Sequence, residues 1–199
     1  MPTANSKGTQ PRRRLSAPER RARIEDAATT LIGQRGYSGA SMDAIAFAAG
    51  ITAPVLYEHF SSKPALYEAV LRCHFANLRA IWSTRIVDRL SESSVTDSLD
   101  AWFSYVEENP DAARLLFREP AVAEASAIHR AVSEESRTLV LRVLTATVDG
   151  KRLAPTPEDL EMRWVVLRGV LQGLALWWVD HPQVSRQRVL AAALNALAP

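Results

Sequence analysis

The 199-residue sequence predicts an all-α protein of about nine helices. Apolar residues recur three and four positions apart in every long segment, which is the spacing of an amphipathic helix. Residues that cap helices, together with glycine and proline, separate these segments. Alternating polar and apolar residues, which are typical of a half-buried strand, do not continue for a useful length. We expect a disordered basic tail at residues 1–15, a small domain at residues 16–65 and a larger helical domain at residues 66–199.

A capping box marks the start of the first helix. Ser16 can accept a hydrogen bond from a backbone N–H that lacks a partner within the helix, and Glu19 can reach back to the N–H of Ser16. Gly36 is expected to end this helix, because glycine adopts a left-handed backbone at little cost. The apolar stripe of the helix consists of Ile24, Ala27, Ala28, Leu31 and Ile32.

Two short helices joined by a tight turn are predicted within residues 41–60. Ser41 is the expected cap of the first, and Gly50 is placed to end it. Thr52 is the expected cap of the second, and Pro54 lies in its first turn, where no N–H is needed. Two helices around a glycine turn of about three residues match the helix-turn-helix motif. This pattern indicates a segment built to enter a DNA groove.

Six further helices are predicted after this motif. Serine residues at 91–94 are expected to break the chain between the first two of the six, and prolines and glycines separate the others. The predicted ranges are 62–90, 95–108, 111–118, 121–148, 158–179 and 185–197.

Composition and charge favour a cytoplasmic protein that contacts DNA through its N-terminal part. Residues 1–65 carry nine Lys and Arg against five Asp and Glu, whereas the remaining residues carry fifteen against seventeen. A single cysteine, Cys73, excludes a disulfide within the chain. No segment has the apolar run of about 18 residues that a membrane span needs, so we expect no membrane partner.

Three consecutive arginines, Arg12, Arg13 and Arg14, end the polar N-terminal segment. They are either a solvated charge cluster or an arm that follows DNA phosphates and enters a narrow minor groove, where the potential is most negative. The sequence leaves both interpretations open.

No catalytic, cofactor or metal motif accompanies the helices, so we expect no enzyme activity. The sequence has no dinucleotide-binding, Walker or HExxH motif. Gly33, Gly36 and Gly39 have the spacing of a glycine-rich loop, but no strand precedes them. The four histidines are scattered along the chain, which does not favour a metal site.

Residues 36–71 resemble the DNA-binding domain of TetR-family transcriptional regulators. Leu56, Tyr57, His59, Phe60, Ser62, Lys63 and Leu66 fall at the spacing of that family. The resemblance covers roughly a quarter to a third of the chain. It implies a dimer that binds double-stranded operator DNA, acts as a repressor and responds to a small-molecule effector. Many members have small polar residues or glycine in place of Pro54 and Val55, so no base preference is transferred.

The second short helix is expected to read DNA mainly through its N-terminal residues. Thr52, Ala53 and Val55 can place methyl groups on thymine, and the Thr52 hydroxyl can reach a base or a phosphate. The resemblance implies phosphate contacts from Tyr57, His59 and Lys63, to which Ser41 can add its hydroxyl or N–H. Leu56 and Phe60 are expected in the core.

The dimer interface is predicted in residues 158–179 together with residues 185–197. Gly169 and Gly173, four positions apart, would let two helices approach closely. The apolar candidates are Val166, Val170, Leu174, Trp177, Trp178, Val189 and Ala193. The same residues could instead fill the core of one protomer, and the resemblance favours an interface of four helices related by a two-fold axis.

An effector pocket among the middle helices is implied by the resemblance. The candidate lining residues are Trp102, Phe103, Leu116, Phe117, Val140 and Trp164, although aromatic residues at helical spacing are also typical of a plain core. Arg137, Arg142 and Arg168 are either partners of an acidic effector or solvated surface charges. We expect a hydrophobic or amphipathic effector. The alternative function is a helical protein that binds a small molecule or a partner without specific DNA recognition.

Overall fold

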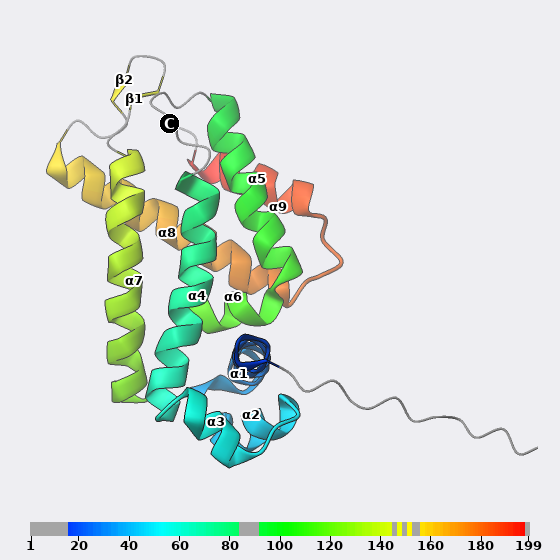
Figure 1. The fold of residues 1–199 in the computed structure, drawn as a ribbon. Coiled ribbons are helices and arrows are strands. Elements are labelled where there is room, and N and C mark those ends of the chain that lie inside the picture. Colours follow the sequence, from blue (N-terminus) through cyan, green and yellow to red (C-terminus); the bar gives the residue numbers. More distant parts are fainter. Residues whose placement is uncertain (1–15, 84–91, 145–146, 149–150, 153–155, 198–199) are drawn as a thin grey trace, which may run out of the picture.

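The computed structural model describes residues 16–83, 92–144, 147–148, 151–152 and 156–197. The all-α prediction is confirmed, and two strands of two residues each, β1 (Thr147–Val148) and β2 (Lys151–Arg152), form an antiparallel pair between α7 and α8. Within the described ranges, no helix is long and apolar enough to cross a membrane. The helices (Figure 1) are α1 (Ala17–Gly39), α2 (Met42–Ala48), α3 (Ala53–His59), α4 (Lys63–Ser83), α5 (Glu92–Glu108), α6 (Pro110–Phe117), α7 (Ala123–Leu144), α8 (Pro157–Val179) and α9 (Arg186–Leu197).

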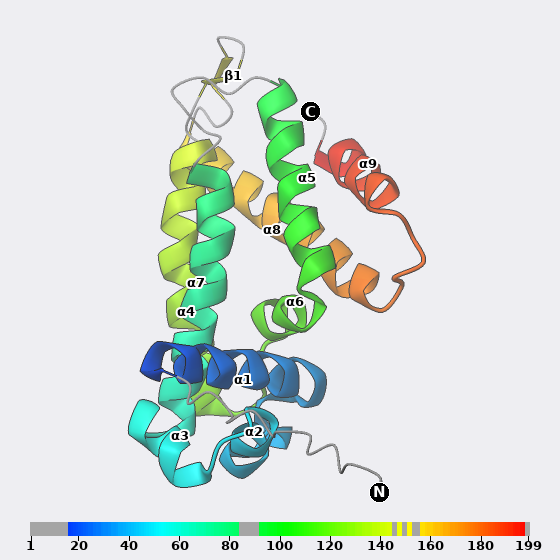
Figure 2. The same cartoon turned by 45° about the vertical axis from the view of Figure 1, so that its right-hand side comes forward.

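Helices α1, α2 and α3 gather at one end of the molecule (Figures 1 and 2). The predicted capping box starts α1, since the Ser16 N–H donates to the Glu19 carboxylate at 2.7 Å and the Ser16 hydroxyl accepts from the Glu19 N–H at 3.4 Å. Gly36 interrupts α1 with φ of 72°, and the last turn of the helix follows it. Gly50, with φ of 69°, makes the turn between α2 and α3. Local capping therefore sets the angles between these helices.

Helix α4 connects this end of the molecule to the remaining helices. The Ser62 hydroxyl accepts from the Ala65 N–H at 3.3 Å and caps α4 as predicted. From there α4 runs alongside α7 (Figures 1 and 2). Helix α4 also packs on α1, so it contacts both the N-terminal helices and α7.

Helix α6 lies between α1 and α8, and α9 packs on α5 and α8 (Figure 2). A second capping box begins α8, where the Thr156 hydroxyl accepts from the Asp159 N–H at 3.1 Å. One continuous cluster of buried apolar side chains extends from α1 to α9. The helix-turn-helix and the C-terminal helices thus share a core.

Three predicted boundaries differ from the structure by three residues or more, and the first is the end of α1, which continues beyond Gly36 to Gly39. Helix α5 begins at Glu92, so Ser93 and Ser94 lie in its first turn instead of in a break. Serine is tolerated there because the first N–H groups of a helix have no helical partner. Helix α7 ends at Leu144 instead of Val148, which pairs with Lys151 in the short hairpin. The predicted tail at residues 1–15 and the predicted end of α4 near residue 90 lie outside the described residues.

Candidate DNA-binding surface and effector pocket

Helix α3 turns one side toward the core and the other toward solvent. Leu56 is fully buried within α3, and Phe60 is buried directly after it, as expected. Thr52 is exposed, Ala53 and Val55 are half-buried, and Tyr57 is 51% exposed. Thr52, Val55 and Tyr57 therefore lie on the outward side of α3, whereas Ala53 packs against the core.

Thr52 occupies the cap position of α3 with extended backbone angles, but its side chain makes no capping hydrogen bond. This corrects the prediction that its hydroxyl caps the helix. Pro54, in the first turn, has no N–H to be satisfied, which reduces the need for a cap. The exposed Thr52 hydroxyl is therefore not engaged in a hydrogen bond with the N-terminus of α3.

The candidate phosphate contacts lie around the ends of α2, α3 and α4. The Ser41 hydroxyl accepts from the Ala44 N–H at 3.1 Å, and the residue is exposed. His59 is half-buried in the last turn of α3. The Lys63 ammonium lies 4.3 Å from the centroid of the Tyr37 ring, and partial burial lowers the pKa of this lysine. Arg12, Arg13 and Arg14 lie outside the described residues.

Phe47 is a feature of α2 that our sequence interpretation did not single out. It is 88% exposed, which is unusual for a phenylalanine. The apolar positions of α2 are Met42, Ile45 and Ala46, and Phe47 falls off that stripe. The helical period could therefore have identified it as a surface residue.

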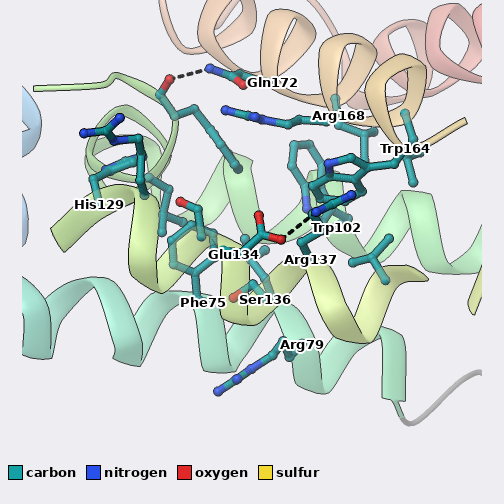
Figure 3. A pocket seen from close by; sticks show the side chains of 18 of the residues that line it. Phe75, Arg79, Trp102, His129, Glu134, Ser136, Arg137, Trp164, Arg168 and Gln172 are labelled. Atoms are coloured by element: carbon teal, nitrogen blue, oxygen red, sulfur yellow. Dashed lines mark hydrogen bonds and ion pairs between the residues drawn. The ribbon is translucent and has the colours of Figure 1, made fainter. Parts of the chain in front are cut away.

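A pocket of about 490 Å³ lies between α4, α5, α6, α7 and α8 (Figure 3). Five of the six predicted lining residues line it: Trp102, Leu116, Phe117, Val140 and Trp164. The further apolar lining residues are Phe75, Leu78, Leu167 and Leu171. The polar lining residues are Arg79, Glu119, His129, Arg130, Ser133, Glu134, Ser136, Arg137, Arg168 and Gln172.

Phe103, the sixth predicted lining residue, belongs to the core. It is fully buried, and its ring centroid lies 5.0 Å from that of Trp102 and 6.0 Å from that of Trp178. Trp102 and Phe103 are neighbours on α5 and therefore point in different directions, so only the first faces the cavity.

Charged side chains line the pocket together with the apolar ones. Arg137 donates to Glu134 at 2.6 Å and also pairs with Glu161, while its buried Nε has no partner among the described residues. Arg130 lies 3.9 Å from Glu119. Figure 3 shows Arg168 extending from α8 toward the cavity. The side chain of Arg142 lies outside the described residues.

His129 lines the pocket and is itself buried. Its Nδ1 lies 3.0 Å from the Tyr67 hydroxyl, although the two residues are 62 positions apart in the sequence. Burial lowers the pKa of His129 and, for the phenol, raises the pKa of Tyr67. Burial thus favours the neutral form of both groups.

The candidate dimer surface is a stripe along the exposed side of α8. Val165 is 64% exposed and Val166 is 50% exposed, and Gly169, Gly173 and Trp177 continue the stripe. A Cβ added at either glycine would meet no atom within 4 Å, so the backbone is open to a close neighbour. Val170 and Leu174 are half-buried against the core.

Three predicted interface residues are instead buried inside the protomer: Trp178, Val189 and Ala193. Trp178 donates its indole N–H to the Val184 carbonyl at 2.8 Å, which ties the connection before α9 to α8. The stripe of α8 therefore carries the candidate interface, and the inward side of α9 does not.

Comparison with known proteins places the helix-turn-helix in a family. Residues 24–70 match the family model described as bacterial regulatory proteins, tetR family. A segment of 114 residues is 39% identical to the transcriptional activator FasR of Mycolicibacterium smegmatis, covering 56% of this chain and 51% of FasR. A segment of 86 residues is 33% identical to IcaR of Staphylococcus aureus strain Newman, the negative regulator of a biofilm operon, covering 43% of each chain. The matches span about half the length of these curated relatives.

Solved structures resemble the whole fold. A TetR-like transcriptional regulator from Rhodococcus sp. RHA1 superposes with a TM-score of 0.74 at 20% identity, over 92% of this chain and 96% of that one. FadR of Bacillus subtilis, solved in complex with stearoyl-CoA, superposes with a TM-score of 0.71 at 16% identity, over 88% and 95% of the two chains. At these identities the likeness shows the fold. Residues 24–70 therefore form a DNA-binding domain of the tetR family of bacterial regulatory proteins, and the whole chain has the fold of TetR-like regulators.

Proposed function

We propose that this chain is a ligand-responsive repressor that binds a palindromic operator as a homodimer and is released by a small amphipathic effector. The exposed side of α3 carries the proposal, because Thr52, Val55 and Tyr57 are presented there while Leu56 anchors the helix in the core. Ser41 and Lys63, at the starts of α2 and α4, flank that side as candidate phosphate contacts. A cytoplasmic location, where the DNA lies, is part of the proposal.

The chemistry of α3 determines how an operator would be read. The helix has the sequence APVLYEH, which lacks the Arg, Asn and Gln side chains that make paired hydrogen bonds to bases. Ala53 and Val55 offer methyl groups to thymine, and Thr52 adds a hydroxyl. We therefore expect DNA shape and thymine contacts to supply much of the specificity.

Dimerisation supports operator binding, because a single helix-turn-helix buries too little surface for tight specific binding. The stripe of Val165, Val166, Gly169, Gly173 and Trp177 on α8 would pack on its copy around a two-fold axis. Such an interface fixes the distance between the two α3 helices, which should match half-sites about one turn of DNA apart.

The pocket supports an effector with an apolar body and a polar or acidic group. Nine apolar or aromatic side chains line it together with four arginines and two glutamates, so the lining has an excess of positive charge. A volume of about 490 Å³ is in the range of small-molecule sites. FadR of Bacillus subtilis was solved with stearoyl-CoA, so acyl compounds are the first class to test. The effector acts only if it binds one of two conformations more tightly.

Selection from random DNA followed by binding measurements tests the proposal. The full chain would be used to select duplexes, and fluorescence anisotropy would compare the selected site with a scrambled one across salt concentrations. We expect a palindromic site, a specificity ratio of at least about 10³ and a dimer on DNA. Palmitoyl-CoA would then be added, with release of the site expected. Failure to select any site would contradict DNA recognition and favour a helical protein that binds only a small molecule or a partner.

A further inference from the structure

We propose that Tyr37 and Tyr67 are positioning residues that hold Lys63 for its phosphate contact and connect it to His129 in the pocket wall. The inference rests on the proposed function and adds the route by which an occupied pocket changes DNA binding. Three contacts carry it, and they link α7 to α4, α4 to α1, and α1 to the start of α4.

The contact of Lys63 with Tyr37 determines where the ammonium group lies. The ammonium sits 4.3 Å from the ring centroid, within the range of a cation–π interaction. A lysine side chain otherwise samples many rotamers, since its four-carbon stem is flexible. The Tyr37 ring therefore restricts the ammonium to one region near the start of α4, where the resemblance implies a phosphate contact.

The Tyr37 ring is held in turn by Tyr67. The two ring centroids are 5.0 Å apart in an edge-to-face arrangement with an interplanar angle of 63°. Both tyrosines are buried, so water does not compete with the contact between their rings. Tyr67 also lies one helical turn after Lys63 on α4, which places the three side chains in one cluster.

The position of the Tyr67 side chain depends on that of His129, because the buried Tyr67 hydroxyl needs a hydrogen-bond partner. The Tyr67 hydroxyl and His129 Nδ1 are 3.0 Å apart, and a buried hydroxyl without a hydrogen bond is costly. His129 comes from α7 and lines the effector pocket (Figure 3). A ligand that moves this imidazole must therefore move Tyr67 or break their hydrogen bond.

A second cavity gives the two tyrosines room to respond. It has a volume of about 290 Å³ and is lined by Tyr37 and other residues of α1, Tyr67 of α4, Leu115 of α6 and residues 118–121 that follow α6. In a close-packed core a ring has no alternative position, whereas a ring beside free volume can adopt a second one. The relay of His129, Tyr67, Tyr37 and Lys63 thus has space for two arrangements, as a switch requires.

Lysine NMR tests the relay without a ligand or DNA. The sequence has three lysines, Lys7, Lys63 and Lys151, so a full chain labelled with ¹³C at the lysine ε-carbon gives three assignable signals. The Tyr37 ring should shift the Lys63 signal upfield of the other two, and Tyr37→Leu should remove that shift. His129→Phe and Tyr67→Phe, which break the hydrogen bond, should each move the Lys63 signal and leave Lys7 and Lys151 in place.

Two further variants make the NMR result specific. His129→Gln keeps a hydrogen-bonding side chain and should restore the Lys63 signal toward its wild-type position. His181→Phe is the matched control, because His181 stacks on Trp177 at the far end of α8 and should leave the signal unchanged. An unchanged Lys63 signal in folded His129→Phe and Tyr67→Phe would overturn the relay.

DNA affinity gives the second readout. Phosphate contacts do not depend on sequence, so a 30-base-pair duplex of arbitrary sequence at low salt is a sufficient probe. His129→Phe should weaken binding about fivefold, and the effect should vanish when combined with Lys63→Met. Equal effects in the presence and absence of Lys63 would also overturn the relay. If no variant and no wild-type protein binds DNA, the proposed function fails while the NMR result still decides the relay.

Discussion

The backbone of Gly33 lies directly against the backbone of Asp111. A Cβ at Gly33 would be 2.3 Å from the Asp111 carbonyl oxygen, closer than atoms can approach. The Gln34 amide donates to the Asp111 carboxylate at 2.9 Å, and Arg114 pairs with the same carboxylate at 3.1 Å. Arg114 also donates to the Val179 carbonyl at 3.0 Å, so one contact network joins α1, α6 and the end of α8.

Replacing Gly33 with alanine should weaken the packing of α1 on α6. Because the clash is with backbone atoms, α1 and α6 must separate, and we expect the free energy of unfolding to fall by about 1–3 kcal/mol. Urea unfolding followed by circular dichroism measures the change. Gln34→Ala is the control, since it removes one exposed hydrogen bond and should cost about 1 kcal/mol or less. Equal losses in the two variants would contradict close packing at Gly33.

A charge in the stripe on α8 should separate the proposed dimer. Val166 is half exposed in one protomer, and in a two-fold interface its replacement by glutamate would bury two like charges near each other. Analytical ultracentrifugation should then show a dimer for the wild type and a monomer for Val166→Glu. Val122→Glu, at an exposed valine before α7, is the control and should remain dimeric. A dimer in both variants would exclude this stripe as the interface.

Arg168 should favour an acidic effector over a neutral one of the same length. It lines the pocket from α8, and its positive charge should attract a carboxylate while leaving an alcohol little affected. Quenching of tryptophan fluorescence measures binding, because Trp102 and Trp164 line the cavity. Arg168→Leu should weaken palmitate binding about tenfold and hexadecanol binding much less. Arg163→Leu, outside the lining, is the control, and an equal loss for both ligands would contradict the charge effect.

A buried histidine, His129, and a half-buried one, His74, should make the fold sensitive to mild acid. Burial lowers the pKa of His74 and of His129 below the ordinary value of 6.5. As the pH falls through that value the unfolded chain takes up protons first, so the free energy of unfolding decreases until the folded histidines also protonate. Urea unfolding at about pH 7.5 and about pH 5.5 brackets this window. The His74→Gln/His129→Gln double variant should show a smaller decrease, and an unchanged decrease would assign the acid sensitivity to other groups.

Local features of the fold could be predicted from the sequence because short stretches of chain determine them. The cap at Ser41 and the turn at Gly50 depend only on neighbouring residues, and both occur as expected. The hydroxyl of Thr52 is the exception. It does not cap α3, where Pro54 removes one N–H that a cap would satisfy.

Tertiary relationships could not be predicted in the same way. Helical periodicity places Phe103, Trp178 and Val189 on apolar faces of their helices. It does not show which helix covers those faces, and in the structure all three residues are part of the core. The hydrogen bond of Tyr67 to His129 joins positions 62 residues apart and depends on how α4 packs on α7. Five of the nine apolar lining residues of the pocket were predicted, whereas His129 and Glu134 on α7 and Glu119 before that helix belong to no motif.

The most direct test of DNA recognition is the operator affinity of a Tyr57→Ala/His59→Ala double variant at about 150 mM salt. Fluorescence anisotropy on the selected operator would compare it with the wild type and with Glu58→Ala, a neighbouring exposed residue on α3. The account predicts nanomolar, competitor-resistant binding for the wild type and a loss of at least about tenfold in the double variant. Glu58→Ala should bind as tightly as the wild type or more tightly, because it removes a negative charge. Undiminished affinity in a folded double variant would contradict the assignment of α3 as the DNA-reading helix.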